Sequence, residues 1–156
     1  MPIVLRHNER LELNIAEYRG VVGAAALEAL NAFLTANPAY LKRDCISVVA
    51  PGAVFAVDAQ SLDRLFVRYA QIYATLSFPI QRRSAWVCRS PNAQPHVDHW
   101  VGAPNARDAI SSTLTQFETL AGAGRWLALG DDDIAKLERG EGFAEVARFE
   151  DPNLSR

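Results

Sequence analysis

Residues 45–76 read CISVVAPGAVFAVDAQSLDRLFVRYAQIYATL, and this stretch decides the fold class. Its first six residues form an apolar run with β-branched side chains, which is typical of a central strand covered on both faces. From residue 61 onward apolar residues recur at helical spacing and polar residues fall between them, so residues 61–77 are predicted to form an amphipathic helix. The apolar positions of this helix are Leu62, Leu65, Phe66, Tyr69, Ile72, Tyr73 and Leu76. Asp58 or Ser61 can cap its N-terminus.

Two strands and a helix are predicted on the N-terminal side of this stretch. Residues 3–5 are apolar, and in residues 10–19 apolar and polar residues alternate, which predicts a half-buried strand. His7, Asn8 and Glu9 lie between the two runs, so we expect an antiparallel hairpin. Residues 22–36, VGAAALEALNAFLTA, favour a helix.

The helix over residues 22–36 is unusually apolar, because only Glu28 and Asn31 are plainly polar. Such a helix is either nearly buried or covered by a partner chain. We therefore expect a homodimer. The alternative is a monomer in which Phe143 and Phe149 of the C-terminal tail cover this helix.

The C-terminal side continues the alternation of strands and helices. Residues 84–90, SAWVCRS, predict a fourth strand, residues 112–117 a weaker one, and residues 118–129 a helix. Residues 90–105 hold three prolines and are expected to form a long loop with at most a short helix; long loops are often functional. The order indicates a single-domain α/β fold over residues 1–130 with a mixed sheet. Residues 131–156 are expected to form a helical tail packed on it.

Composition and charge exclude several classes of protein. The 156 residues are 49% hydrophobic and carry a net charge of −2, which fits one folded domain and argues against a nucleic-acid binder. No apolar run reaches the ~20 residues that a membrane span needs. Two cysteines in an otherwise ordinary chain favour a reducing compartment, so we expect a cytoplasmic protein.

Three features of the chain resemble the SpoIIAA-like, STAS-type family. The first is the opening hairpin that ends in residues 18–21, Tyr-Arg-Gly-Val, and the second is the strand at Asp44 followed by a capped helix that begins at residues 58–62. The third is Gln116-Phe117-Glu118 leading to Trp126-Leu127. The resemblance covers about residues 3–129, and it implies four or five strands with helices mainly on one face.

In bacterial anti-sigma-factor antagonists of this family, a serine at the start of the second helix accepts phosphate. The family pattern there is Asp-Ser-Ser-Gly-Leu, and this chain has Asp58-Ala59-Gln60-Ser61-Leu62. Asp58 and Leu62 match, but Ala59 stands at the phosphoacceptor position and has no hydroxyl. We therefore expect no such phosphorylation switch, and we interpret Ser61 as a cap or first-turn residue.

Two further groups of residues offer chemistry. His96, Asp98 and His99 are ligand types for zinc or a non-haem metal, but near-adjacent ligands are geometrically awkward, and a polar loop packed around Trp100 is the simpler interpretation. Four arginines would form one basic patch if the helix and the following strand lie close: Arg64, Arg68, Arg82 and Arg83. Such a patch would suit a phosphate, a carboxylate or an acidic partner. Cys45 and Cys88 are interpreted as structural thiols.

The sequence thus predicts a non-catalytic cytoplasmic module in a regulatory role that binds a protein partner or a small ligand, including an apolar one. The alternative is a small enzyme that uses His96, Asp98 and His99 of the 90–105 segment. No cofactor and no metal are expected. The candidate contact residues are Asp58, Ser61, Arg64, Arg68, His96, His99 and Trp100. A deep apolar cavity would favour the ligand carrier, and clustered imidazoles would favour the enzyme.

Overall fold

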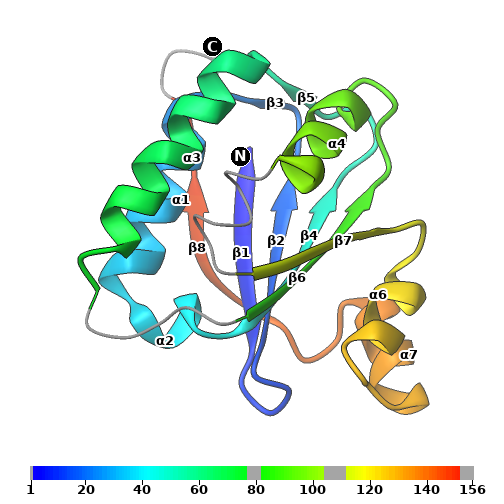
Figure 1. Ribbon diagram of the computed structural model, residues 1–156. Coiled ribbons are helices and arrows are strands. Elements are labelled where there is room, and N and C mark those ends of the chain that lie inside the picture. Colours follow the sequence, from blue (N-terminus) through cyan, green and yellow to red (C-terminus); the bar gives the residue numbers. More distant parts are fainter. Residues whose placement is uncertain (1, 77–81, 104–111, 152–156) are drawn as a thin grey trace.

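A six-stranded mixed sheet forms the centre of the computed structural model, which describes residues 2–76, 82–103 and 112–151 (Figure 1). Its strands are β1 (Ile3–Asn8), β2 (Leu13–Tyr18), β4 (Asp44–Val49), β6 (Arg82–Cys88), β7 (Ser112–Phe117) and β8 (Ala144–Phe149). They lie in the order β7-β6-β4-β2-β1-β8. Two short strands, β3 (Val21–Val22) and β5 (Val54–Phe55), pair separately. The α/β prediction is confirmed, and the sheet is wider than the four or five strands expected.

The strand directions follow from the connections between the strands. β1 and β2 are joined by a short turn and pair antiparallel, as predicted. β2, β4, β6 and β7 run parallel, which requires crossover connections between them. Because β2 lies inside the sheet with helices on both sides, the expectation of a half-buried strand is wrong. Even Asn14 is only 1% exposed, and its Nδ2 donates to the backbone oxygen of Tyr40 at 2.8 Å.

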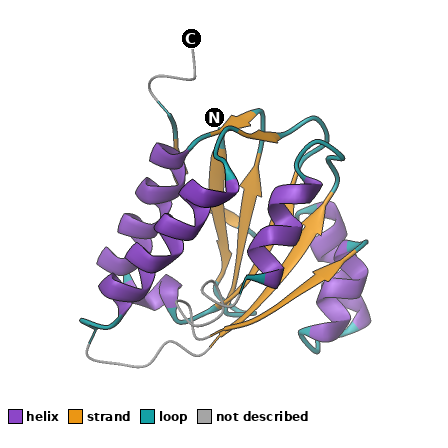
Figure 2. Cartoon of the chain, turned by 45° about the horizontal axis from the view of Figure 1, so that its top comes forward, coloured by secondary structure: helices purple, strands orange, loops and turns teal. Residues whose placement is uncertain are grey.

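Helices cover both faces of the sheet (Figure 2). They are α1 (Ala24–Ala36), α2 (Pro38–Leu41), α3 (Ala59–Tyr73), α4 (Gln94–Gly102), α6 (Leu120–Trp126) and α7 (Asp131–Arg139). α1, α3 and α4 share the larger core cluster with one face, and α6 and α7 pack with the other face. In the described part of the chain, no helix is long and apolar enough to cross a membrane.

The large apolar side chains of α1 are covered within the chain itself. Phe33 packs edge-on against Phe149 of β8, with ring centroids 5.7 Å apart. At the N-terminus of α1, the buried carboxylate of Asp151 accepts hydrogen bonds from the backbone N–H groups of Gly23 (2.6 Å) and Ala26 (3.0 Å). The exposed positions of α1 are alanines and Glu28. The C-terminal tail therefore covers part of the apolar surface of α1. The homodimer stays a prediction.

Two segments differ from the sequence expectation. Residues 94–102 form helix α4 where a long loop was expected, because Pro95 lies in the first helical turn, where its missing N–H is not needed. The tail is not only helical: after α7 it forms β8, which pairs antiparallel with β1. The charged side chains of Glu145 and Arg148 on this edge strand pair with each other at 2.7 Å, and such charges protect an edge from further strand pairing.

Candidate functional site

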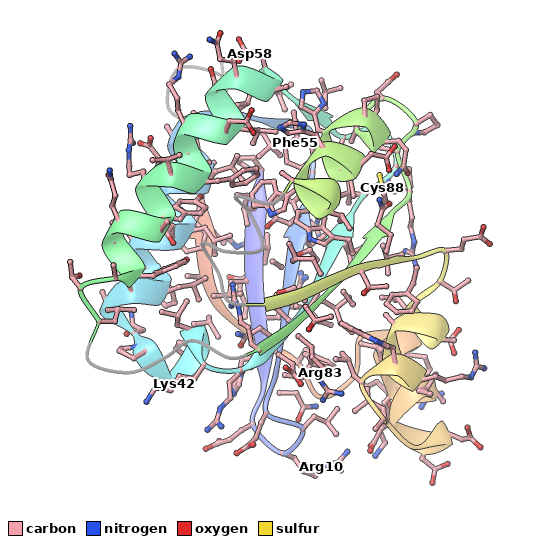
Figure 3. The ribbon with its side chains drawn as sticks, viewed as in Figure 1. Arg10, Lys42, Phe55, Asp58, Arg83 and Cys88 are labelled. Carbon is pink, nitrogen blue, oxygen red and sulfur yellow. The ribbon has the colours of Figure 1, made fainter. Side chains whose placement is uncertain are left out.

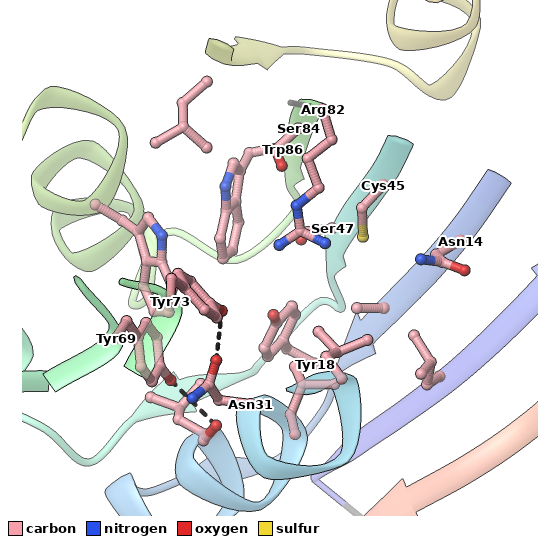
Figure 4. A pocket seen from close by; sticks show the side chains of 17 residues that line it. Asn14, Tyr18, Asn31, Cys45, Ser47, Tyr69, Tyr73, Arg82, Ser84 and Trp86 are labelled. Atoms are coloured by element: carbon pink, nitrogen blue, oxygen red, sulfur yellow. Dashed lines mark hydrogen bonds between the residues drawn. The ribbon is translucent and has the colours of Figure 1, made fainter. Parts of the chain in front are cut away.

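A cavity of about 60 Å³ lies between the sheet and the helices α1, α3 and α4 (Figure 4). Alternate side chains of a strand point to the same face, so the strand register fixes the cavity floor. Asn14, Cys45 and Ser84 form one row across β2, β4 and β6, and Ala16 lies beside Ser47 in the next row. These side chains are small, so the helices above them cannot fill all the space.

Aromatic rings form one wall of the cavity. Tyr18 and Trp86 are stacked with centroids 5.4 Å apart, and Trp86 lies 5.1 Å from Trp100 of α4. Trp100 in turn meets the buried ring of Phe66 edge-on at 4.9 Å. The remaining apolar lining comes from Leu5, Leu27, Leu30, Leu34 and Leu114. Because each ring is packed against the next, this wall has a fixed shape.

Two tyrosine hydroxyls of α3 connect that helix to α1 across the cavity. Tyr69 donates a hydrogen bond to the backbone oxygen of Leu27 at 3.1 Å, and Tyr73 donates to Oδ1 of Asn31. Burial raises the pKa of both tyrosines, so both hydroxyls stay protonated at neutral pH. These polar groups lie between leucine side chains at the back of the cavity.

Arg82, the first residue of β6, sends its side chain into this cavity (Figure 4). Its Nε atom is buried and has no hydrogen-bond partner among the described residues. Among the described residues that line the cavity there is no aspartate or glutamate, and Arg82 is the only charged residue. The neighbouring Arg83 points to the other face and is paired with Asp44 at 2.8 Å. The Nε atoms of the two adjacent arginines therefore differ: that of Arg83 is hydrogen-bonded to Asp44, and that of Arg82 has no partner in the described part of the chain.

The groups around Arg82 are neutral at physiological pH. Burial raises the pKa of the Tyr18 hydroxyl and of the Cys45 thiol, and the Arg82 charge only partly offsets that effect. A thiol is nucleophilic as the thiolate, so the buried Cys45 is not activated for attack. Cys45 and Cys88 are both free thiols, in agreement with their interpretation as structural cysteines.

A second hollow of about 430 Å³ opens over the other face, beside α7. Two of its three arginines are already neutralised within the chain. Arg6 pairs with Glu17 at 2.9 Å, and Arg139 pairs with Glu141 at 2.8 Å. Its third arginine, Arg89, is exposed to solvent, so the hollow lacks a buried cation such as the one in the cavity at Arg82.

The residues at the start of α3 satisfy one another. Asp58 is the N-cap and accepts a 2.7 Å hydrogen bond from the backbone N–H of Ser61, which holds the pKa of the Asp58 carboxyl below its usual range. Arg64 donates to the Ser61 hydroxyl at 3.2 Å, and Arg68 forms an exposed ion pair with Glu28 of α1. Ser61 is thus a first-turn residue, as interpreted, and none of these four residues lines the cavity.

The four arginines do not form the basic patch that was considered for the case in which α3 and β6 lie close. Arg64 and Arg68 lie on the exposed side of α3, whereas Arg82 enters the cavity and Arg83 pairs with Asp44 on the other face. Figure 3 shows Asp58, where α3 begins, and Arg83 at opposite ends of the molecule. The separation arises because successive side chains of a strand point to opposite faces.

The three residues of the enzyme hypothesis each contact different partners and do not bond to one another. His96 Nε2 lies 2.6 Å from the backbone oxygen of Val57, and His99 Nε2 lies 2.8 Å from Oδ1 of Asp63. Asp98 accepts hydrogen bonds from Gln94 and Gln116, which lower the pKa of its carboxyl. Among the described residues no group of three His, Cys, Asp or Glu side chains is placed to hold a metal ion.

The chain matches no family model, no curated protein and no solved structure. The resemblance to the SpoIIAA-like, STAS-type family therefore remains a prediction.

Of the seven candidate contact residues taken from the sequence, only Trp100 lines the cavity; Arg82 and Cys45, singled out for other reasons, line it as well. The sequence signals for the cavity floor were small residues at every second position of the predicted strands: Ala16, Cys45, Ser47 and Ser84. Arg82 was considered as part of a surface patch, because the residues before a strand do not indicate to which face of the sheet its first side chain will point.

Proposed function

We propose that this chain is a non-catalytic binding module that holds a small organic molecule in the cavity between the sheet and α1, α3 and α4. The observation that carries the proposal is the combination of an apolar, aromatic wall with a small number of polar side chains, one of them the cation Arg82, which is the usual composition of a ligand pocket. The proposal keeps the ligand half of the sequence prediction and leaves out a docking protein.

The chemistry of the cavity supports binding rather than catalysis. General acid–base catalysis needs a group whose pKa lies near the working pH. The titratable neighbours of Arg82 are Tyr18, Tyr73 and Cys45, and burial moves the pKa of each upward, away from neutrality. A regulatory role in the cytoplasm, in which occupancy of the cavity is the signal, fits this composition and the two free thiols.

The position of the cavity also suits a module whose state depends on its ligand. Three separate helices close over the cavity, and the Tyr69 and Tyr73 hydroxyls hold α3 to α1. A ligand that contacts both helices binds the folded, closed arrangement in preference to an open one, and therefore stabilises it.

The test is an NMR titration of the folded protein with a matched series of small molecules: propionate, propionamide and propanol. The indole N–H signals of Trp86 and Trp100 report on the cavity. Trp126 of α6 contacts Phe117, 5.4 Å away, and belongs to the core of the opposite face, so it is the internal control. We expect at least one compound to shift the first two signals and leave the third unchanged.

Two strand variants make the test specific. Ala16→Val narrows the cavity and is expected to abolish the shifts, whereas Ala144→Val, the same change at an exposed position of β8, should preserve them. If no compound shifts Trp86 or Trp100, or if the shifts persist in Ala16→Val, the cavity is not a binding site and the proposal fails.

A further inference from the structure

We infer that the ligand of this cavity is a small monocarboxylate whose carboxylate is bound by the guanidinium of Arg82; this inference rests on the function proposed above and adds the chemical class. Four observations lead to it: an unpaired buried Nε, a single positive charge, neutral donors around it, and a small volume.

The first observation is the hydrogen-bonding state of Arg82. A guanidinium is always protonated and has five N–H donors, and a buried donor without a partner is unfavourable. Arg83 shows the satisfied arrangement one residue further along the same strand. Its Nε and Nη2 lie 3.2 and 2.8 Å from Oδ2 of Asp44. Arg82 Nε has no such partner in the described part of the chain, and a carboxylate is the group that fits the edge of a guanidinium.

The second observation is the charge of the site. Arg82 is the only charged residue among the described residues that line the cavity. One positive charge neutralises a monoanion. A phosphate group carries a charge of about −1.5 to −2 near neutral pH, so it would leave negative charge in a largely apolar enclosure, which is unfavourable.

The third observation concerns the remaining donors. Tyr18, Ser47 and Ser84 line the cavity together with Arg82 (Figure 4). Burial raises the pKa of Tyr18, so its hydroxyl keeps its proton and can donate to an anion. The site therefore combines one cation with neutral donors and has no acidic side chain among its described residues that would repel a carboxylate.

The fourth observation is the size of the cavity. Its volume of about 60 Å³ is about twice the share of one water molecule in the liquid, ~30 Å³. Such a volume limits the ligand to the smallest monocarboxylates, with formate and acetate nearest in size and propionate at the upper limit. The leucine and tryptophan wall receives the chain, while Arg82 receives the charged end.

The experiment compares acid and amide of the same shape. Acetate and acetamide form one pair, and propionate and propionamide form a second. Each compound is titrated separately at constant ionic strength, and the indole signals of Trp86 and Trp100 report its binding. Inorganic phosphate is a further probe. We expect each acid to bind about tenfold or more tightly than its amide, because hydrogen bonds to a charged group are the stronger ones. Phosphate should bind more weakly than either acid.

Arg82→Gln and Arg82→Met remove the charge, and Arg83→Gln is the matched control on the other face. The Arg82 variants are expected to lose acid binding by about tenfold to a hundredfold while amide binding changes little, and Arg83→Gln should match the unaltered protein. The Trp126 signal checks that each variant is folded.

Each outcome bears on a different statement. If acid and amide bind equally to the unaltered protein, or if the Arg82 variants keep their preference for the acid, the carboxylate inference is wrong while the proposed function stands. If phosphate binds more tightly than the acids, the ligand class is wrong. If none of the compounds binds, both the inference and the proposed function fail.

Discussion

The two faces of the sheet are packed in different ways. Under α6 and α7, a Cβ atom added at Gly124 would lie 2.9 Å from Cγ1 of Ile134, so the two helices approach as closely as a glycine allows. Under α1, α3 and α4, the row of small side chains in β2, β4 and β6 keeps a cavity of about 60 Å³. Gly124 thus brings α6 and α7 together, whereas the small residues of the other face hold a space open beneath its helices; the hollow of about 430 Å³ lies beside α7, over the face of α6 and α7.

Arg82 and Arg83 repeat this difference within two adjacent residues. On the face of α6 and α7, Arg83 is exposed and bonded to Asp44. On the cavity face, the Nε of Arg82 is buried without a hydrogen-bond partner among the described residues. Unsatisfied buried polar groups are uncommon in native proteins, so each calls for an explanation. Arg82 therefore belongs to the face with the enclosed cavity, and Arg83 to the face on which α6 and α7 approach closely.

The largest effects are expected from truncation of buried side chains on either face. Phe66→Ala on the cavity face should lower the free energy of unfolding by about 3–5 kcal/mol, and Leu137→Ala on the other face by about 2–5 kcal/mol, since each leaves a hole. Urea denaturation provides the measurement.

Arg68→Ala, which removes only the exposed ion pair with Glu28, is the control and should change stability by about 1 kcal/mol at most. If Phe66→Ala lowers the free energy of unfolding by less than about 1 kcal/mol, the whole cavity face is loosely packed. That result would contradict a single cavity within an otherwise packed core.

The next effect is a loss of stability in alkali that originates on the cavity face. Burial raises the pKa values of Tyr18, Tyr69 and Tyr73. An unfolded tyrosine loses its proton near pH ~10, whereas the buried ones keep theirs. Stability is therefore fully present below pH ~10 and falls as the pH rises, by about 1 kcal/mol per pH unit for each tyrosine. The raised thiol pKa values of Cys45 and Cys88 act in the same direction from about pH 9.

Urea denaturation between about pH 8 and about pH 11 measures this slope. Tyr69→Phe removes one of the three tyrosines and should make the slope shallower, even though it also loses the hydrogen bond to Leu27. An unchanged slope in Tyr69→Phe would show that its burial does not control the alkaline transition.

Adding carbon atoms should have opposite effects on the two faces. Gly124→Ala forces Ile134 to move, which should lower the free energy of unfolding by about 1–3 kcal/mol. The higher helix propensity of alanine offsets up to about 1 kcal/mol of that loss. Ala16→Val extends into the cavity and should leave stability unchanged or raise it by about 1 kcal/mol. Thermal unfolding of the two variants gives the comparison, and equal destabilisation by both would contradict the difference between the faces.

The smallest effects are expected from the two arginines. Arg82→Met should keep or slightly raise stability, by up to about 1 kcal/mol, because it removes an unpaired buried donor. Arg83→Met should lower it by up to about 1 kcal/mol, because it removes a partly exposed ion pair. Chemical denaturation in parallel determines the sign for each. A clear destabilisation by Arg82→Met would assign Arg82 a structural role in place of ligand binding.

Local patterns in the sequence predicted much of the fold. The alternation in residues 10–19, the apolar run of β4 and the helical period of α3 each predicted the correct element type, because each pattern follows from the geometry of a strand or a helix. The prolines near α4 led to the prediction of a long loop with at most a short helix, although proline fits a first helical turn as well as a loop. The strand β8 was missed because edge strands rich in charge lack an apolar run.

The α/β class, the hairpin, the central strand and the apolar character of α1 follow from residues close together in the chain, so they can be predicted from the sequence. That Phe149 and Asp151 cover and cap α1, and that Ala16, Cys45, Ser47 and Ser84 meet beneath three helices, becomes visible only in the folded chain. The tertiary structure also shows that Arg82 enters the cavity while Arg83 pairs with Asp44. The physical reason is that a cavity is the space left between elements distant in sequence, so strand register and helix placement determine it together, and no local pattern encodes either.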